Sequence, residues 1–226
     1  GKNSLQLALP ERAIIAFRPG DIKRITSLHG ASLNTAWENI RLIYHLKDTN
    51  TIMTQSSIGG PGIAALVEEL TAFGVRQVFL WGYCGALGDN ATVGDVILAE
   101  SAIREDGVSY HYMRTEDDPA ESKCVHEWCD AALSFGIEIG TVWTCDAIYR
   151  ETEAKVTRFI SEGVKGVEME VASFYAVCTH LGIKGVAFLV VSDKLMNGGW
   201  QSGFGTKAFR TGVNRLRDFI LKECIS

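Results

Sequence analysis

The stretch Gly166-Val167-Glu168-Met169-Glu170-Val171-Ala172-Ser173 joins a predicted short strand to an almost wholly apolar helix. The strand is expected over residues 165–168. The helix is expected over residues 171–181, where apolar side chains cover more than one face, so it should be buried. Glu168 and Glu170 would then lie beside a core, where an ionised carboxylate must be hydrogen-bonded or paired. Ligands of open α/β sheets bind beyond the carboxyl ends of strands, where this pair falls. The alternative is that Glu170 only complements the helix dipole.

Strand-like and helix-like segments alternate on both sides of this junction. The alternation predicts one α/β domain over residues 1–226, with a mixed, largely parallel central sheet flanked by helices. A glycine-rich loop is expected at residues 82–88, and Asp193 is expected just past the end of a strand. Strands are predicted at residues 13–17, 39–47, 51–55, 77–81, 95–104, 137–144 and 184–192, and helices at residues 21–29, 61–74, 121–135, 151–161 and 207–223.

The composition is that of an ordinary globular protein and excludes several classes. Among 226 residues, 27 acidic against 22 basic side chains give a net charge of −5, which argues against a nucleic-acid surface. The longest apolar run, residues 186–191, is too short to span a bilayer, and no secretory signal pattern is present. Six cysteines without CxxC spacing, and the lack of an HExxH motif, predict a reduced, cytoplasmic protein without a metal site.

One predicted strand end offers an anion site. Gly20 falls at the start of a predicted helix, where backbone N–H groups favour anions, and Arg24 follows one turn later. The alternative is that Gly20-Asp21 is only a helix cap. The sequence has no GxGxxG, P-loop or G-x-S-x-G motif, which disfavours dinucleotide, nucleotide triphosphatase and serine hydrolase sites.

Taken in order, five motifs resemble the nucleoside phosphorylase/nucleosidase superfamily of the purine nucleoside phosphorylase and uridine phosphorylase type. The resemblance covers nearly the whole chain and implies a twisted, partly barrel-like sheet and a homo-oligomer, from dimer to hexamer. It also implies cleavage of the N-glycosidic bond of a nucleoside by phosphate or water. The motifs are Pro19-Gly20-Asp21 with Arg24, Ile58-Gly59-Gly60-Pro61, Gly82-Tyr83-Cys84-Gly85-Ala86, Val167-Glu168-Met169-Glu170 and Val191-Ser192-Asp193.

The resemblance also implies roles for single residues. Asp193 matches the acid that protonates or hydrogen-bonds a leaving purine, which is general acid work. Glu170 matches the residue that binds the ribose hydroxyls, and Met169 and Glu168 join it at the sugar. The remaining candidates are Gly20, Arg24 and Arg41 for phosphate, the last donated to a neighbouring subunit, and Tyr149, Ile148, Gly85 and Cys84 for the base.

Two departures from the pattern concern the nucleophile. Leu80 and Tyr83 stand where phosphorylases have an arginine and a small hydroxyl residue. The expected function is cleavage of a purine nucleoside, which could carry a 5′ modification, by phosphate as co-substrate and without a further cofactor. A hydrolytic nucleosidase and a non-catalytic nucleoside-binding relative remain the alternatives. Neither a nucleic acid nor a membrane is expected as a partner.

Overall fold

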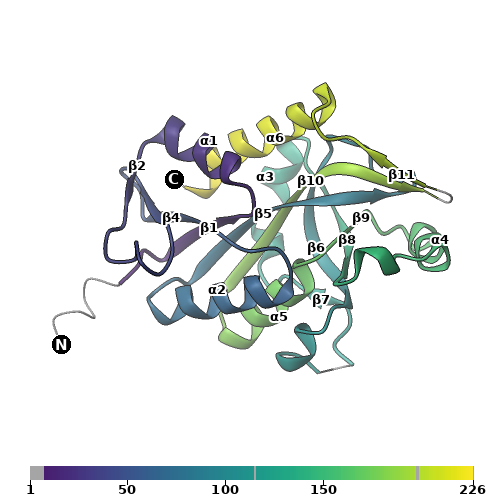
Figure 1. Ribbon diagram of the computed structural model, residues 1–226, viewed down its shortest axis with the longest axis horizontal. Coiled ribbons are helices and arrows are strands. Elements are labelled where there is room, and N and C mark those ends of the chain that lie inside the picture. The colour runs from purple at the N-terminus through teal and green to yellow at the C-terminus, as the bar shows by residue number, and fades with distance from the viewer. Residues whose placement is uncertain (1–7, 115, 197–198, 226) are drawn as a thin grey trace.

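The computed structural model describes residues 8–114, 116–196 and 199–225, which form one α/β domain (Figure 1). Residues 1–7 and 226 of the predicted domain lie outside the described residues. The strands are β1 (Arg12–Ala16), β2 (Ala31–Leu33), β3 (Ile43–Leu46), β4 (Thr51–Gln55), β5 (Gln77–Leu87), β6 (Val96–Glu105), β7 (Ala120–Glu121), β8 (Glu138–Cys145), β9 (Gly166–Glu168), β10 (Lys184–Met196) and β11 (Gly199–Ser202). The α-helices are α1 (Pro19–His29), α2 (Gly60–Ala72), α3 (Cys129–Ser134), α4 (Glu153–Ser161), α5 (Val171–Leu181) and α6 (Lys207–Phe219).

All strands of the described residues belong to one twisted sheet. Its order is β11-β10-β6-β8-β9-β5-β1-β4-β3-β2, with β7 beside β6. Because β5 also pairs with β10, the strands from β10 through β6, β8 and β9 to β5 close into a ring. The ladders β1–β4, β1–β5, β5–β10, β6–β8 and β8–β9 are parallel, whereas the others are antiparallel. The predicted mixed, largely parallel and partly barrel-like sheet is therefore confirmed, since the longest ladders, β5–β10 and β6–β8, are parallel.

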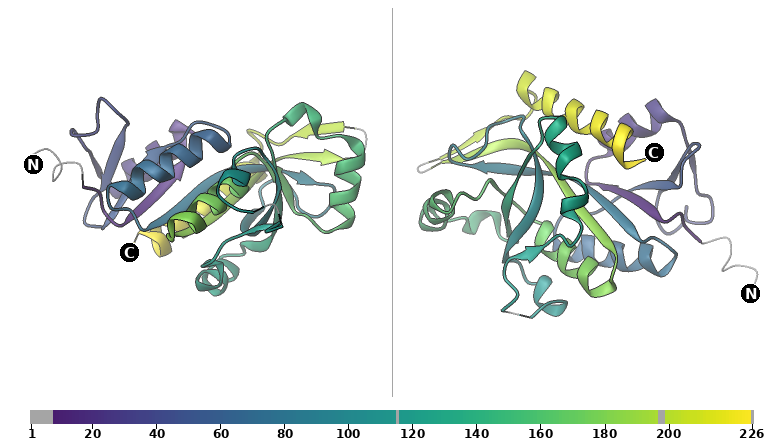
Figure 2. Two further views of the ribbon diagram at one scale, coloured as in Figure 1. Left: turned by 90° about the horizontal axis from the view of Figure 1, so that it is seen from below. Right: turned by 180° about the vertical axis from the view of Figure 1, so that it is seen from behind.

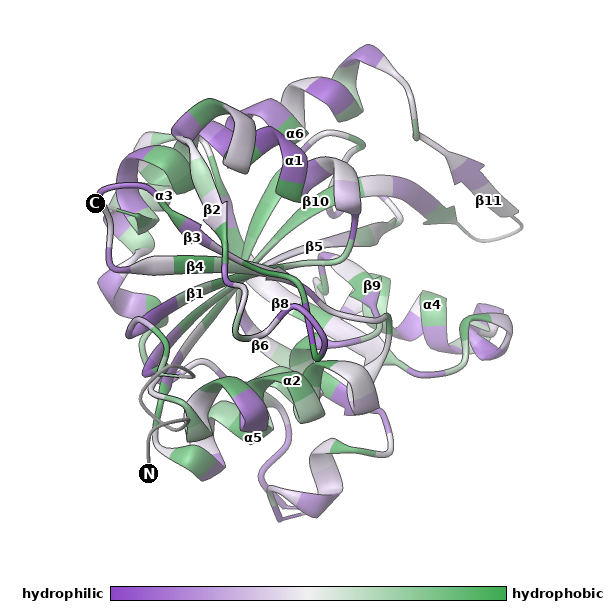
Figure 3. Cartoon of the chain, turned by 60° about the vertical axis from the view of Figure 1, so that its left-hand side comes forward, coloured by the Kyte–Doolittle hydropathy of each residue, from purple (hydrophilic) through white to green (hydrophobic). Residues whose placement is uncertain are grey.

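Helices cover both faces of the sheet, as the views in Figure 2 show. Helices α2 and α5 share one apolar cluster with the sheet, and α1, α3 and α6 share another. Figure 3 shows hydrophobic colour along the central strands and α5, and alternating colours on α1 and α6. The pattern follows from burial, since residues 171–178 of α5 are all buried, whereas α6 buries one face only. No helix of the described ranges combines the length and hydropathy that crossing a bilayer requires.

Several predicted boundaries were wrong. The expected loop at residues 82–88 largely continues β5, because hydrogen bonds to β10 and β9 extend the strand to Leu87. Strand β10 likewise runs to Met196, so Asp193 lies inside a strand. The predicted helix 121–135 is reduced to a 3-10 turn (Val125–Glu127) and α3, and the predicted strand 39–47 begins only at Ile43. Strands β2, β7 and β11 were not predicted.

Candidate active site

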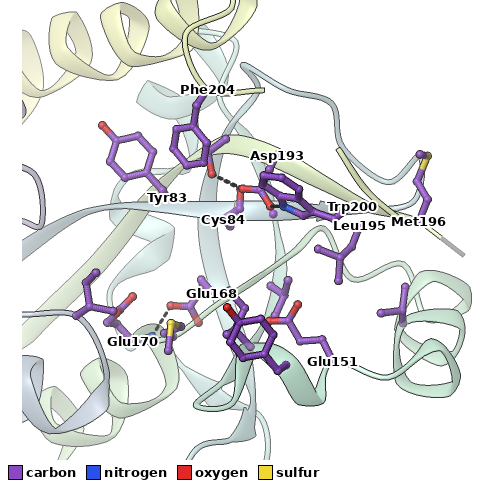
Figure 4. Close-up of a pocket in the computed structure, with 18 of the residues that line it drawn as sticks. Tyr83, Cys84, Glu151, Glu168, Glu170, Asp193, Leu195, Met196, Trp200 and Phe204 are labelled. Carbon is purple, nitrogen blue, oxygen red and sulfur yellow. Dashed lines mark hydrogen bonds between the residues drawn. The ribbon is translucent and has the colours of Figure 1, made fainter. Parts of the chain in front are cut away.

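A cavity of about 960 Å³ is lined by residues of β5, β9, β10 and β11, by α4 and by the segment that precedes α1. Figure 4 shows Asp193 and Trp200 on one wall, and Glu168 and Glu170 on the facing wall. We call the part lined by Phe17, Arg18, Tyr83 and Phe204 the α1 end. The part lined by Ile148, Glu151, Val156, Leu195 and Met196 is the α4 end.

The two glutamates of the junction between β9 and α5 differ in their hydrogen bonds. Oε2 of Glu168 accepts the backbone N–H groups of Glu170 (2.6 Å) and Val171 (2.8 Å), and its Oε1 accepts the Thr144 hydroxyl. Glu168 therefore fixes the first turn of α5. The carboxylate of Glu170 accepts the backbone N–H of Gly59, at 2.6 Å and through Oε1. Glu170 is thus less fully bonded to the protein than Glu168, and it keeps hydrogen-bonding capacity for a ligand in the cavity.

Burial controls the protonation of this pair. Burial raises the pKa of Glu168, which the neighbouring Glu170 raises further, whereas the Thr144 hydroxyl and two N–H groups oppose the shift. Burial is also the main cause that raises the pKa of Glu170, and the bond from Gly59 opposes it. Two adjacent carboxyls with little access to water cannot both ionise cheaply, so the pair favours retention of one proton.

Asp193 is held by an irregularity of β10. The register of β10 against β5 shifts between Val191 and Asp193, which places Asp193 opposite Gly85. A Cβ atom at position 85 would lie 2.8 Å from Oδ2 of Asp193, so only glycine leaves room for this carboxylate. The Ser192 hydroxyl donates to Oδ1 at 2.6 Å, and the indole N–H of Trp200 on β11 donates to Oδ2 at 2.7 Å. Both oxygens therefore accept a protein hydrogen bond.

The base-binding candidates all line the cavity, but they differ in exposure. Cys84 is buried, and burial raises the pKa of its thiol well above the usual range. Its side chain therefore lines the cavity as an uncharged thiol and does not act as a nucleophile. Tyr149 is 96% exposed and Ile148 is 56% exposed, so both lie at the rim. The side chain of Tyr149 therefore makes almost no contact with the rest of the protein in this arrangement.

At the α1 end, the cationic side chain of Arg18 lies beside Tyr83, which is hydrogen-bonded to Asp21. The guanidinium of Arg18 lies 5.3 Å from the centroid of the Tyr83 ring. The Tyr83 hydroxyl donates to Oδ2 of Asp21 at 2.6 Å. Burial raises the pKa of Asp21, while the bond from Tyr83 and the charges of Arg18 and Arg24 oppose the shift. Among the described residues that line the cavity, Arg18 is the one cationic side chain.

The three predicted phosphate residues do not line this cavity. Gly20 lies in the exposed first turn of α1. The guanidinium of Arg24 donates to Oδ1 of Asn214 on α6 at 3.3 Å, and that of Arg41 bonds Glu69 on α2 at 2.8 Å. A phosphate role for Arg41 needs a neighbouring subunit's cavity, so it stays a prediction. Leu80 does not line the cavity either, because its side chain is buried in the core and only 1% exposed.

Three cavity residues were missed by the sequence reasoning. Arg18 directly precedes Pro19-Gly20, and a basic residue before a helix N-terminus could have signalled an anion site. Glu151 was assigned only to the start of a helix. Trp200 lies on β11, a strand that no pattern in the sequence indicated.

Comparisons with known proteins identify the family of the chain. A family model described as the phosphorylase superfamily matches residues 11–225. The chain belongs to the phosphorylase superfamily. It is 31% identical to a guanosine phosphorylase of Halorubrum lacusprofundi over 193 residues, 83% of this chain and 80% of the relative. It is 28% identical to a DeoD-type purine nucleoside phosphorylase of Caldanaerobacter subterraneus, covering 80% of this chain and 82% of the relative.

The superfamily assignment confirms the predicted enzyme class, a pentosyltransferase of nucleoside phosphorylase type. A uridine phosphorylase of Haemophilus influenzae is 26% identical over 76% of this chain and 77% of its own, so family membership alone leaves the base open. A purine nucleoside phosphorylase of Toxoplasma gondii, solved in complex with immucillin-H, superposes with a TM-score of 0.84. It is 21% identical and covers 97% of this chain and 92% of its own, which confirms the fold.

Proposed function

We propose that this protein cleaves the N-glycosidic bond of a purine nucleoside with phosphate, and releases the free base and ribose 1-phosphate. The observation that carries the proposal is that one cavity, which Met169 also lines, holds Asp193 on one wall and Glu170 on the facing wall. Cleavage develops positive charge on the ribose and negative charge on the base. A carboxylate near the sugar and an acid near the base match both charges.

The two ends of the cavity suggest where each reactant binds. Glu170 has hydrogen-bonding capacity left for the ribose hydroxyls, which would fix the sugar for in-line attack. The α4 end, with Val156 and Leu195, offers apolar walls for the base beside Asp193. Phosphate would bind at the α1 end, where Arg18 supplies a charge and directly precedes the N-terminus of α1. No other cofactor takes part in this scheme, and a homo-oligomer would add Arg41.

A second candidate function is hydrolysis. The hydrogen bond between Tyr83 and Asp21 favours hydrolysis. The bond holds the carboxylate of Asp21 next to the α1 end, and a carboxylate there would repel an anion such as phosphate. Water could occupy this end and attack the ribose, with its proton passing to the Tyr83 hydroxyl and from there to Asp21, which lies behind Tyr83 and does not line the cavity. We rank hydrolysis second because Arg18 lies in the same place and offsets the charge of Asp21.

A nucleoside panel assayed with and without phosphate tests the proposal. We expect release of a purine base that depends on phosphate and yields ribose 1-phosphate. Asp193→Asn should lower kcat/KM by about tenfold or more, because a hydrogen bond to a charged group contributes roughly 1.5–3 kcal/mol. Undiminished release of free ribose without phosphate would replace phosphorolysis by hydrolysis. Release of no base from any nucleoside would leave a binding protein.

A further inference from the structure

The cavity continues beyond Asp193 along the ladder between β5 and β10. On β5, Tyr83 lines the α1 end, and Gly85 and Leu87 follow it along the strand. Asp193 lies opposite Gly85, and Leu195 lies opposite Leu87 in this parallel ladder. Figure 4 shows the same order, with Leu195 on the side of Asp193 that is away from Tyr83. The cavity therefore runs from the α1 end past Asp193 to Leu195 at the α4 end.

Asp193 and Leu195 lie next to each other on one face of β10. Residues two apart on a strand share a face and are separated by about 7 Å along it. A Cβ atom at position 85 would lie 2.8 Å from Oδ2 of Asp193 and 3.6 Å from Cδ1 of Leu195. The carboxylate and the leucine methyl group therefore lie over the same glycine. A ligand that is hydrogen-bonded to Asp193 would meet an apolar side chain directly beyond it.

The walls of the α4 end are mainly apolar. Val156 is buried, and Leu195 packs against the apolar cluster to which Val156 belongs. Met196 and Ile148 are partly exposed and line the cavity at its rim. Glu151 contributes a carboxyl group, which can accept a hydrogen bond. Such walls suit an apolar group that is attached to a ligand through a hydrogen-bond donor.

We propose that the α4 end binds an apolar substituent on the exocyclic nitrogen at C6 of the purine, which makes 6-alkylaminopurine nucleosides the preferred substrate class. The inference rests on the proposed function, in which Asp193 acts on the leaving base. The acid acts at N7, a ring nitrogen that takes up charge when the bond to N9 breaks. C5 carries both N7 and C6, so a substituent at C6 leaves the ring beside Asp193. It then points along β10 towards Leu195, while the ribose lies towards Glu170.

An apolar substituent gains contacts in this end that an unsubstituted purine lacks. Adenosine and inosine would leave Leu195 and Val156 facing water, whereas an alkyl or benzyl group would cover them. The hydrogen that remains on the exocyclic nitrogen is available to the carboxyl of Glu151, and a 6-oxo group has no such hydrogen. One methylene in a hydrophobic pocket changes kcat/KM by about 10–200-fold. The lower part of this range applies here, because Met196 and Ile148 are partly exposed.

Steady-state kinetics of base release from adenosine and from N6-benzyladenosine test the proposal. We expect kcat/KM to be at least about tenfold higher for N6-benzyladenosine. Leu195→Asn keeps the size of the side chain and removes its apolar surface, so the ratio of the two kcat/KM values should fall by at least about fivefold. Met196→Gln changes a partly exposed side chain that the fold does not depend on, and it should lower the same ratio by at least about threefold.

Leu133→Asn is the matched control, because Leu133 is an exposed leucine on α3 that does not line the cavity, and its ratio should equal that of the unmodified protein. A ratio of one or less in the unmodified protein would overturn the proposal. So would a ratio that stays unchanged in both Leu195→Asn and Met196→Gln, or cleavage of inosine and guanosine with neither adenosine substrate cleaved. Failure of the proposed function is distinguishable, since inosine, guanosine and adenosine would then all release no base. The ratio does not depend on the nucleophile, because both substrates are attacked by the same one.

Discussion

The hydroxyl of Tyr83 donates a 2.6 Å hydrogen bond to Oδ2 of Asp21, and this bond ties β5 to the first turn of α1. The phenol ring also lies beside the guanidinium of Arg18 and the ring of Phe209. Tyr83, which lines the α1 end, is thereby held by residues of α1 and α6 that lie behind the cavity wall. A cation and a buried carboxylate compete there to set the local charge, and the balance decides whether an anion can bind.

Removing the negative charge should improve phosphate binding. In Asp21→Asn the amide keeps the shape of the carboxylate and can still accept the bond from Tyr83, but it no longer offsets Arg18. We expect the KM for phosphate to fall by at least about threefold. A full tenfold fall would require a gain of about 1.36 kcal/mol in binding free energy. Phosphate titration of base release measures it. Asp218→Asn on the surface is the control, and equal KM values in both variants would show that the charge of Asp21 does not reach the phosphate.

A methyl group at position 85 should disturb Asp193 without disturbing the fold. The added Cβ of Gly85→Ala would lie 2.8 Å from Oδ2 of Asp193, so the carboxylate must move away from Trp200. We expect kcat/KM to fall by about tenfold or more, with a change in unfolding free energy near 1 kcal/mol. Gly107→Ala is the matched control, since its Cβ would meet nothing closer than 3.7 Å. Full activity in Gly85→Ala would mean that the position of Asp193 is not critical.

Glu170 should distinguish ribose from deoxyribose. Charge-assisted hydrogen bonds to hydroxyls contribute roughly 1.5–3 kcal/mol each, so Glu170→Ala should reduce kcat/KM for ribonucleosides by at least about tenfold. The loss for 2′-deoxynucleosides should be smaller, because one hydroxyl is already absent. Steady-state kinetics with both sugars measure the difference. Equal losses would show that Glu170 does not contact the 2′ position.

The burial of Glu170 should also appear in the pH dependence of stability. Its pKa is raised in the folded protein, so the stability it contributes is complete below the ordinary glutamate pKa of about 4.3 and is lost as pH rises through the folded value. Urea unfolding at pH 5, 6.5 and 8 should therefore show that Glu170→Gln gains stability relative to the unmodified protein as pH rises. A difference that is constant with pH would contradict a raised pKa.

The sequence predicted those parts of the fold and site that local patterns determine. The buried helix at residues 171–181 was confirmed because its apolar side chains exceed one helical face. Strand 51–55 was placed correctly, since a turn precedes it and a glycine-rich segment follows. The cavity brings together Asp193, Glu170, Met169 and the base-binding candidates, as their positions at the ends of predicted elements suggested.

Features that depend on pairing between distant strands could not be predicted. Glycines at 82, 85 and 88 indicate a loop when β5 is read alone, but β10 supplies partners that extend the strand. The same ladder places Asp193 within β10. The hydrogen bond from Trp200 requires that β11 folds back on β10, and its residues carry no alternating apolar pattern. The side chain of Leu80 was expected near phosphate, yet strand alternation directs it into the core.

Strand β10 belongs to two environments, since residues 186–191 are buried in the core and Lys194, Leu195 and Met196 are partly exposed beside the cavity. Amides of the first part should exchange with deuterium only when the whole domain unfolds, whereas those of the second can exchange through local opening. A ligand that fills the cavity will slow exchange in the second part and leave the protection of the first part unchanged. Occupancy can thus be read from the contrast within one strand, whichever nucleoside or nucleophile the protein prefers.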